Sequence, residues 1–388
     1  MFNPHDFLSE EVKMIKPSGI RKFFDIAGSM KDVISLGVGE PDFVTPWHIR
    51  DAAVKSVSEG RTYYTSNYGL IELRHEISNY IEKTINLSYN PADEILVTVG
   101  ASEGLDIAIR SIVSKGDEVL IPEPSFVCYK PCVILAGGTP VPIVTTADND
   151  FKLTKDSLIS KITDKTKVLV LPYPNNPTGG IMTKEDLEAI APIIKERNLI
   201  VISDEIYSEL TYNKAHVSIA ELPDMRDRTI VINGFSKAFA MTGWRLGYIC
   251  CHKGFLDAMM KIHQYIIMSA STISQYAAIA ALKNGRPDIE AMKEEYNIRR
   301  NFLVNELHNM GIECFNPLGA FYVFPSIKKF GFSSDEFCEK LLYEEKLAIV
   351  PGNAFGDSGE GYVRISYAYS TENISKALKR LKKFIDRL

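Results

Sequence analysis

The sequence has few of the features that mark secreted, metal-binding or membrane proteins. Its six cysteines are scattered over 388 residues, too sparse for a disulfide framework, which favours reduced thiols in a cytoplasmic protein. No apolar run is long enough to span a membrane, and the chain starts without the basic and apolar segments of a signal peptide. The seven histidines form no H-E-x-x-H motif, so we expect no catalytic metal.

A strong excess of one charge is also absent. The 44 lysines and arginines and the 49 aspartates and glutamates leave a net charge of -5, which gives no electrostatic reason to expect a nucleic acid or an anionic membrane as partner. Basic residues do gather between Lys376 and Arg387, but apolar residues recur among them at helical spacing, which indicates a solvated helix face. The composition is otherwise that of an ordinary soluble globular protein.

What the sequence does contain is an alternation of apolar strand-like runs and helix-like segments from about residue 47 to 285. This alternation predicts an α/β fold with a mostly parallel sheet. Because the chain is longer than one hydrophobic core supports, we expect a large domain over residues 47–285 and a smaller α+β domain from residues 1–46 and 286–388. The strand-like runs are Ile95–Val99, Val119–Ile121, Val168–Leu171, Leu199–Ser203 and Thr229–Asn233, with Ala320–Phe324 and Tyr362–Ser366 in the smaller domain.

A lysine and an arginine, eight residues apart, follow the run Thr229–Ile232. Lys237 can form a Schiff base with an aldehyde, and Arg245 can hold a phosphate, with Ser236 adding a hydroxyl. Pyridoxal phosphate needs these two attachments. Taken alone, the pattern favours an ordinary surface lysine at a helix end, and the cofactor role rests on the other matching residues elsewhere in the chain.

A second phosphate-binding element is the turn Gly100-Ala101-Ser102, between a strand-like run and a helix-like segment. Backbone amides at a helix start converge on an anion, and the helix dipole favours negative charge there. The alternative is a structural turn, because any strand-to-helix connection can use glycine.

Other polar residues also follow strand ends, where open α/β sheets bind ligands. Asp204 can keep a pyridine nitrogen protonated, which makes the ring an electron sink, although Asp in such a position is often a helix N-cap. Asn176 and Tyr207 can both bond the ring's phenolic oxygen, although Asn176 stands in an Asn-Asn-Pro-Thr-Gly turn that explains it equally well. Phe126 can stack on the ring, although a lone Phe usually belongs to a core.

Two residues have expected roles toward the substrate. Lys237, once displaced by a substrate amine, can carry the proton between the substrate's α-carbon and the cofactor. Arg364 can bind a substrate carboxylate through its planar fork, although an arginine in a strand-like run otherwise points to solvent.

In their order along the chain these motifs resemble the class I aminotransferases of pyridoxal-phosphate fold type I, in the subgroup that includes bacterial aspartate, aromatic and N-acetyl-diaminopimelate enzymes. The resemblance implies a seven-stranded sheet in the large domain. The segments that carry it are Leu36–Phe43, Tyr64 with Gly69, the Gly100 turn, Pro174–Gly179, Ser203–Tyr207, Ser236–Arg245, Gly319–Tyr322 and the Arg364 strand. One departure is Gly234, where some relatives have a phosphate-binding serine.

The resemblance implies a role for each matching residue. Lys237 would be the imine lysine, Asp204 the partner of the ring nitrogen, and Gly39 with Arg364 the binding site of the substrate carboxylate. Asn176 and Tyr207 would contact the ring oxygen, and Ser236, Arg245 and the amides of Gly100, Ala101 and Ser102 the phosphate. Tyr64 matches a tyrosine that reaches the phosphate of the neighbouring subunit, which implies a homodimer with shared active sites.

The resemblance says less about the substrate than about the cofactor. Ser102-Glu103 stands where dicarboxylate-specific relatives often carry an extra cation, which argues against strict aspartate specificity. Four segments resemble enzymes named for aromatic amino acids or for N-acetyl-L,L-diaminopimelate: Ser18–Phe23, Ser203–Tyr212, His263–Tyr265 and Glu360–Ala368. We therefore expect a ping-pong aminotransferase that uses an aromatic or other large amino donor and 2-oxoglutarate as acceptor. The alternatives are an N-acetyl-L,L-diaminopimelate or aspartate aminotransferase, a carbon–sulfur lyase, and a sensor that binds the cofactor without turnover.

Overall fold

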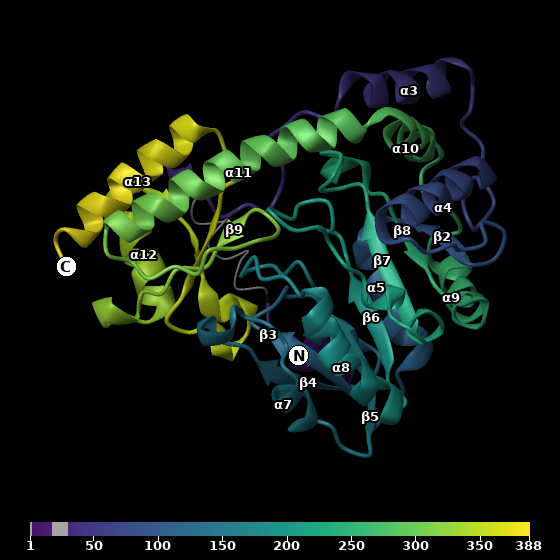
Figure 1. Cartoon of the computed structure of the whole chain (residues 1–388), viewed down its shortest axis with the longest axis horizontal. Helices are drawn as coiled ribbons and strands as arrows, with labels where there is room; N and C mark the ends of the chain where they lie inside the picture. Colours follow the sequence, from purple (N-terminus) through teal and green to yellow (C-terminus); the bar gives the residue numbers. More distant parts are fainter. Residues whose placement is uncertain (1, 18–29) are drawn as a thin grey trace.

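The centre of the molecule is a seven-stranded sheet, seen in a computed structural model that describes residues 2–17 and 30–388 (Figure 1). Its strand order is β2-β8-β7-β6-β5-β3-β4, and β8 alone in this sheet runs antiparallel to its neighbours. The strands are β2 (Ile95–Thr98), β3 (Glu118–Glu123), β4 (Thr139–Val144), β5 (Thr166–Leu171), β6 (Ile200–Asp204), β7 (Thr229–Gly234) and β8 (Gly247–Cys250). The predicted α/β fold with a mostly parallel seven-stranded sheet is confirmed.

Helices cover both faces of this sheet, which is why its strands read as unbroken apolar runs. Neighbouring residues of β6 show the two faces: Ile202 packs with Leu105 and Val201 packs with Leu187, each pair in a separate core. The helices around the sheet are α3 (Trp47–Ser58), α4 (Ile71–Ile85), α5 (Gly100–Ile112), α6 (Tyr129–Leu135), α7 (Lys155–Ile159), α8 (Lys184–Glu196), α9 (Lys253–Ile266) and α10 (Thr272–Asn284).

A second group of elements lies at the C-terminal end of the chain (Figure 1). The long helix α11 (Arg286–Asn309) leads to it from the side of α10, and the antiparallel sheet β11-β12-β9 forms its middle. Its elements are β9 (Tyr322–Val323), α12 (Ser334–Glu345), β10 (Leu347–Ala348), β11 (Val350–Pro351), β12 (Val363–Ser366) and α13 (Thr371–Ile385). The strand β1 (Ile34–Ser35) joins this group by pairing in parallel with β10, so the N-terminal part of the chain contributes to it.

Several other sequence predictions can be compared with the fold. The basic C-terminal segment forms α13, which buries Ile374, Ala377 and Leu381, as its helical spacing predicts. All six cysteines are free. Within residues 2–17 and 30–388, no helix combines the length and the apolar character that a membrane crossing needs. The predicted segment Ser18–Phe23 lies outside the described residues, and the domain boundaries at residues 47 and 285 stay a prediction.

Candidate active site

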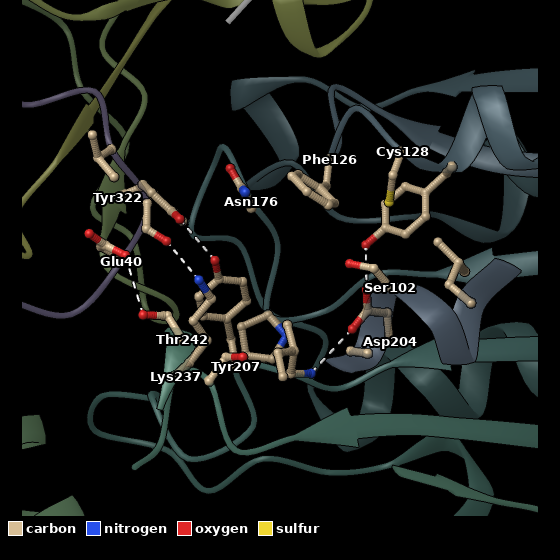
Figure 2. A pocket seen from close by; sticks show the side chains of 18 of the residues that line it. Glu40, Ser102, Phe126, Cys128, Asn176, Asp204, Tyr207, Lys237, Thr242 and Tyr322 are labelled. Carbon is tan, nitrogen blue, oxygen red and sulfur yellow. Dashed lines mark hydrogen bonds between the residues drawn. The ribbon is translucent and has the colours of Figure 1, made fainter. Parts of the chain in front are cut away.

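A cavity of about 320 Å³ opens at the carboxyl ends of β5, β6 and β7, where a mostly parallel sheet is expected to bind ligands. The start of α5 and the strand β12 complete its wall, and Figure 2 shows Ser102, Asn176, Asp204, Tyr207 and Lys237 around the cavity. The wall holds every sequence-predicted site residue except Gly100 and Tyr64: Gly39, Ala101, Ser102, Phe126, Asn176, Asp204, Tyr207, Ser236, Lys237, Arg245 and Arg364. Strands far apart in the sequence therefore bring the predicted residues together.

The first turn of α5 forms one end of the cavity and lies against Arg245. Gly100 has a φ of +75°, and a Cβ at this position would lie 2.7 Å from Arg245 Nη2. A Cβ on Gly247 of β8 would lie 2.6 Å from the Ala101 nitrogen, so the neighbouring strand also needs glycine. Arg245 donates from Nη1 to the Thr242 carbonyl oxygen at 2.9 Å. This end therefore combines a guanidinium with free backbone amides, which suits a phosphate.

Asp204 ends β6 and turns its carboxylate into the cavity. Tyr129 donates its hydroxyl to Oδ2 at 2.8 Å, and the Ile206 nitrogen donates to Oδ1 at 3.3 Å. Burial raises the pKa of Asp204, and the two hydrogen bonds oppose that shift. No helix begins at Asp204, so the N-cap alternative does not hold.

Lys237 follows β7, is half-buried and lines the cavity, which excludes the surface-lysine alternative. Its Nζ donates to the Gly39 carbonyl oxygen at 2.6 Å. Burial lowers the pKa of Lys237 to about 8, Glu40 opposes this shift, and Arg364 and Arg245 add to it. An amine with such a pKa is largely neutral slightly above pH 8, which is the form that attacks an aldehyde.

Arg364 enters the cavity from β12 and is only 3% exposed, so its side chain does not point to solvent. Its Nη1 donates to Asn176 Oδ1 at 2.8 Å, and its Nη2 donates to the Gly37 carbonyl oxygen. The guanidinium lies 4.4 Å from the centre of the Tyr322 ring, and its Nε has no hydrogen-bond partner. The bonds to Asn176 and Gly37 use two of the five N–H donors of a guanidinium that lines the cavity, which suits an incoming carboxylate.

Two comparisons with known proteins decide the family. The sequence profile described as "Aminotransferase class I and II" matches residues 31–381. The chain belongs to this family. YugH of Bacillus subtilis (strain 168), named only as an aminotransferase, is 55% identical over 381 residues, which cover 98% of this chain and 99% of YugH.

Two further relatives carry different substrate names. An aspartate aminotransferase of Pyrococcus abyssi is 47% identical, over 97% of this chain and 98% of the relative. The crystal structure of the aromatic aminotransferase from Pyrococcus horikoshii OT3 superimposes with a TM-score of 0.90 at 44% identity, over 95% of this chain and 99% of that one. The aminotransferase therefore acts on an amino acid and a 2-oxo acid with pyridoxal 5'-phosphate, and these names do not select one donor.

The aminotransferase's cavity fits that cofactor by its own chemistry. It offers a half-buried lysine amine of lowered pKa, a buried carboxylate, and an arginine beside the start of a helix. Tyr207 presents a hydroxyl that lies 2.8 Å from the hydroxyl of Tyr322 (Figure 2). The lysine suits the cofactor's aldehyde and the carboxylate suits its ring nitrogen. The arginine suits its phosphate, and the Tyr207 hydroxyl suits its ring oxygen.

Sequence reasoning gave no role to several residues of the aminotransferase's cavity. Tyr129 bonds Asp204, Tyr322 bonds Tyr207 and stacks on Arg364, and Glu40 accepts from Thr242 Oγ1 at 3.2 Å. Glu40 and Tyr322 lie inside segments that carry the family resemblance. Their position in these segments was the sequence signal that could have indicated a place in the cavity. Tyr129 lies at the start of α6, and no sequence pattern links it to β6.

Tyr64 lies outside the cavity of the single chain. The residue is 83% exposed. Tyr63 and Tyr265 are exposed to a similar degree. A tyrosine in this position contributes nothing to its own chain's cavity wall.

Proposed function

We propose that the aminotransferase takes its amino group from an aromatic or other large L-amino acid. The observation that carries this proposal is the distribution of charge in the cavity. Among the described lining residues the cations are Lys237, Arg245 and Arg364, and each already has a role. No cation of this part of the wall remains for a second carboxylate on the donor. The remaining wall includes the apolar residues Val38, Leu105, Phe126, Pro174 and Ile206.

We infer the residue roles from the same contacts. Arg364 binds the α-carboxylate of the substrate, because its guanidinium lines the cavity and the bonds to Asn176 and to the Gly37 carbonyl use only two of its five N–H donors. Pyridoxal phosphate supplies the aldehyde for covalent attachment and the electron sink for cleaving the Cα–H bond. Asp204 keeps a proton on the ring nitrogen, and Lys237 Nζ takes and returns the α-proton. In this proposal Tyr207 donates to the ring oxygen.

The donor is tested by adding single amino acids to the yellow holoenzyme without any oxo acid. We expect phenylalanine or tyrosine to replace the visible band faster than aspartate at equal concentration. A faster reaction with aspartate would overturn the donor assignment and leave the aminotransferase assignment intact. A band that persists while pyruvate and ammonia accumulate from cystathionine would support the lyase alternative. We propose 2-oxoglutarate as the acceptor on the family resemblance alone. It is tested by adding 2-oxoglutarate to the enzyme that has lost its visible band, which should return.

The lysine role is tested with Lys237→Ala. This variant lacks the amine that attaches the cofactor and moves the proton, so turnover is expected to disappear. Lys253, an exposed lysine paired with Asp93, provides the matched control Lys253→Ala, which should keep activity. Near-wild-type turnover in Lys237→Ala would sink the proposed mechanism.

We further propose a homodimer in which Tyr64 completes the partner's phosphate site. Its support is the exposure of large apolar side chains, since a lone chain rarely leaves so many in water. They include Val44, Trp47, Val54, Tyr63, Tyr64, Tyr265 and Ile266. Sedimentation should give twice the chain mass, and a monomeric active enzyme would exclude the shared site. Tyr64→Phe should lower the affinity for the cofactor several-fold.

A further inference from the structure

A buried glutamate at the end of β3 connects the large sheet to the C-terminal group, and the proposed chemistry does not use it. Glu123 is the last residue of β3 and is only 3% exposed, yet it does not line the cavity. Its Oε1 accepts from the Ser358 nitrogen at 3.1 Å, and its Oε2 forms an ion pair with Lys130 of α6. Ser358 lies in the loop that joins β11 to β12, residues 352–362. A buried carboxylate needs such partners, so Glu123 is held between α6 and this loop.

The β11–β12 loop fits closely against this carboxylate. Gly356 has a φ of +120°, and a Cβ at this position would lie 2.1 Å from Glu123 Cδ, so only glycine allows so close an approach. The backbone adds a second bond, because the Ser125 nitrogen donates to the Phe355 carbonyl oxygen at 3.0 Å. The loop is therefore held to the segment that follows β3 on both sides of Gly356, at Phe355 and at Ser358.

The same loop supplies one of the rings beside the Arg364 guanidinium. The centre of the Phe355 ring lies 4.8 Å from the guanidinium carbon, and Phe355 is buried in a small core with Phe324. The hydrogen bonds of Arg364 go to neutral oxygens of Asn176 and Gly37. The direction of the guanidinium therefore depends on these two bonds and on the rings packed against it. A displaced loop would move one of those rings.

We propose that Glu123 holds the β11–β12 loop in the position in which Phe355 keeps Arg364 directed at the substrate carboxylate. This inference rests on the proposed role of Arg364 in binding that carboxylate. Glu123 is a positioning residue, because it acts through Ser358 and Phe355 from outside the cavity wall. It also lies three residues before Phe126 of the wall, so the loop is fixed relative to the side of the cavity that is proposed to hold the cofactor ring.

The test compares Glu123→Ala with Glu123→Gln in the full-length holoenzyme. Alanine removes the acceptor for the Ser358 nitrogen, whereas glutamine keeps an oxygen at that place. With phenylalanine as donor we expect KM to rise about tenfold in E123A while kcat stays within about twofold of wild type. KM changes alone because a misdirected Arg364 weakens the binding of substrate and transition state alike. In E123Q both constants should stay near their wild-type values.

A binding measurement tests whether the loss passes through Arg364. The probe is hydrocinnamate, which is phenylalanine without its amino group and therefore binds without reacting. Its inhibition constant should rise about tenfold in E123A, whereas the affinity of the cofactor-free variant for pyridoxal phosphate should equal that of wild type. In the Arg364→Leu background, E123A should cause no further loss of hydrocinnamate binding.

Four results would overturn the proposal. They are an unchanged KM in E123A, no recovery in E123Q, a comparable loss of cofactor affinity in E123A, and a further loss of hydrocinnamate binding when E123A is added to R364L. The last two would show that Glu123 supports the cavity in general and not Arg364 in particular.

Glu345→Ala provides the matched control for the loss of a buried, paired carboxylate. Glu345 ends α12, is 6% exposed, forms ion pairs with Lys383 and Arg387, and does not line the cavity. This variant should have a lower Tm and the KM of wild type. A raised KM in E345A would show that donor binding follows stability in general, which contradicts a specific role of Glu123.

Two further outcomes are decided in advance. If E123A does not fold, Glu123→Asp decides: its carboxylate is one methylene shorter in reach, so the proposal predicts a KM raised several-fold with unchanged cofactor affinity, and a wild-type KM contradicts it. If R364L binds hydrocinnamate as tightly as wild type does, the carboxylate site itself is misplaced. In that case this inference falls with the proposed role of Arg364, while the donor experiment on the holoenzyme still stands.

Discussion

Two arginines stand in the same cavity, and they are held in opposite ways. Arg245 is exposed in the single chain, has a left-handed backbone with a φ of +51°, and lies against Gly100 at the start of α5. Arg364 is buried, bonds Asn176, and lies against the rings of Tyr322 and Phe355. Backbone amides and a helix dipole assist the first arginine, and the second has only neutral partners around it.

This difference suits two kinds of anion. A cofactor stays bound through many turnovers. Its phosphate is held more tightly when backbone amides, a helix dipole and an arginine each add a weak attraction. A substrate carboxylate arrives and leaves in every cycle, so a desolvated guanidinium with a free donor binds it strongly while the neutral partners keep the arginine in place. Burial lowers the pKa of Arg364, and the tyrosines Tyr322, Tyr207 and Tyr369 oppose this shift.

Of the two arginines, the buried one should have the larger effect on activity when it is removed. Arg364→Leu is expected to lower kcat/KM by about a thousandfold, because it removes the charged partner of the substrate carboxylate. Arg364→Lys keeps the charge but loses the fork, and it should recover only part of the loss. Affinity for pyridoxal phosphate should change little in both variants. Steady-state kinetics and cofactor titration measure the two properties, and a large loss of cofactor affinity would contradict the division of roles.

Removal of the exposed arginine should instead weaken cofactor binding and leave kcat nearly unchanged once the cofactor is bound. Arg245→Gln is expected to weaken the binding of pyridoxal phosphate about thirtyfold, the scale of one charge-assisted bidentate contact. Excess cofactor should restore most of kcat, since Arg245 does not touch the substrate in this account. Equilibrium dialysis followed by kinetics in saturating cofactor checks both parts. A kcat that stays low in saturating cofactor would show that Arg245 also serves the reaction.

The lysine between the arginines gives a prediction about pH. With a pKa of about 8, Lys237 is mostly protonated at pH 7 and mostly neutral at pH 9. Covalent capture of the cofactor's aldehyde by the cofactor-free enzyme should therefore speed up about tenfold over this range, with a midpoint near pH 8. Both arginines lower this pKa, so Arg364→Leu should move the midpoint upward. Stopped-flow absorbance gives the profile, and an unchanged midpoint in the variant would refute the coupling.

The smallest expected effect concerns stability. The pKa of Asp204 is raised in the folded cofactor-free chain, so the stability it contributes is present below the unfolded value of 3.8 and is lost as pH rises through the folded value. At neutral pH the ionised carboxylate destabilises this form, and Asp204→Asn should raise its Tm by about 2 °C. The same change should strongly lower turnover. A lower Tm in the cofactor-free variant would mean that Tyr129 compensates the charge fully.

The sequence predicted the sheet and most of the cavity because the relevant residues follow strand ends. Asp204 and Lys237 come at or soon after the ends of β6 and β7, and parallel strands bring such ends to one edge. The strands β4 and β8 were not among the predicted runs, and an apolar run carries no sign of its direction, so the antiparallel β8 could not be foreseen. Tyr129 was missed because only tertiary packing brings α6 to the end of β6.

The orientation of Arg364 shows a second limit of sequence reasoning. Taken alone, its strand-like run favoured an arginine that points to solvent, and only the family resemblance indicated a carboxylate-binding role. Tyr322 and Phe355, whose ring centres lie 4.4 Å and 4.8 Å from its guanidinium, lie in other segments near the C-terminal end of the chain. The burial of a charge therefore depends on packing between distant segments, which periodicity does not encode.

The most direct test of this account is to reduce the yellow enzyme with borohydride and map the modified peptide by mass spectrometry. Reduction fixes the bond between the cofactor and the amine that holds it. The account predicts one labelled peptide, containing Lys237, and no label in the Lys237→Ala variant. A label on another lysine, or an enzyme that takes up no pyridoxal phosphate, would contradict the placement of the cofactor between Arg245 and Arg364.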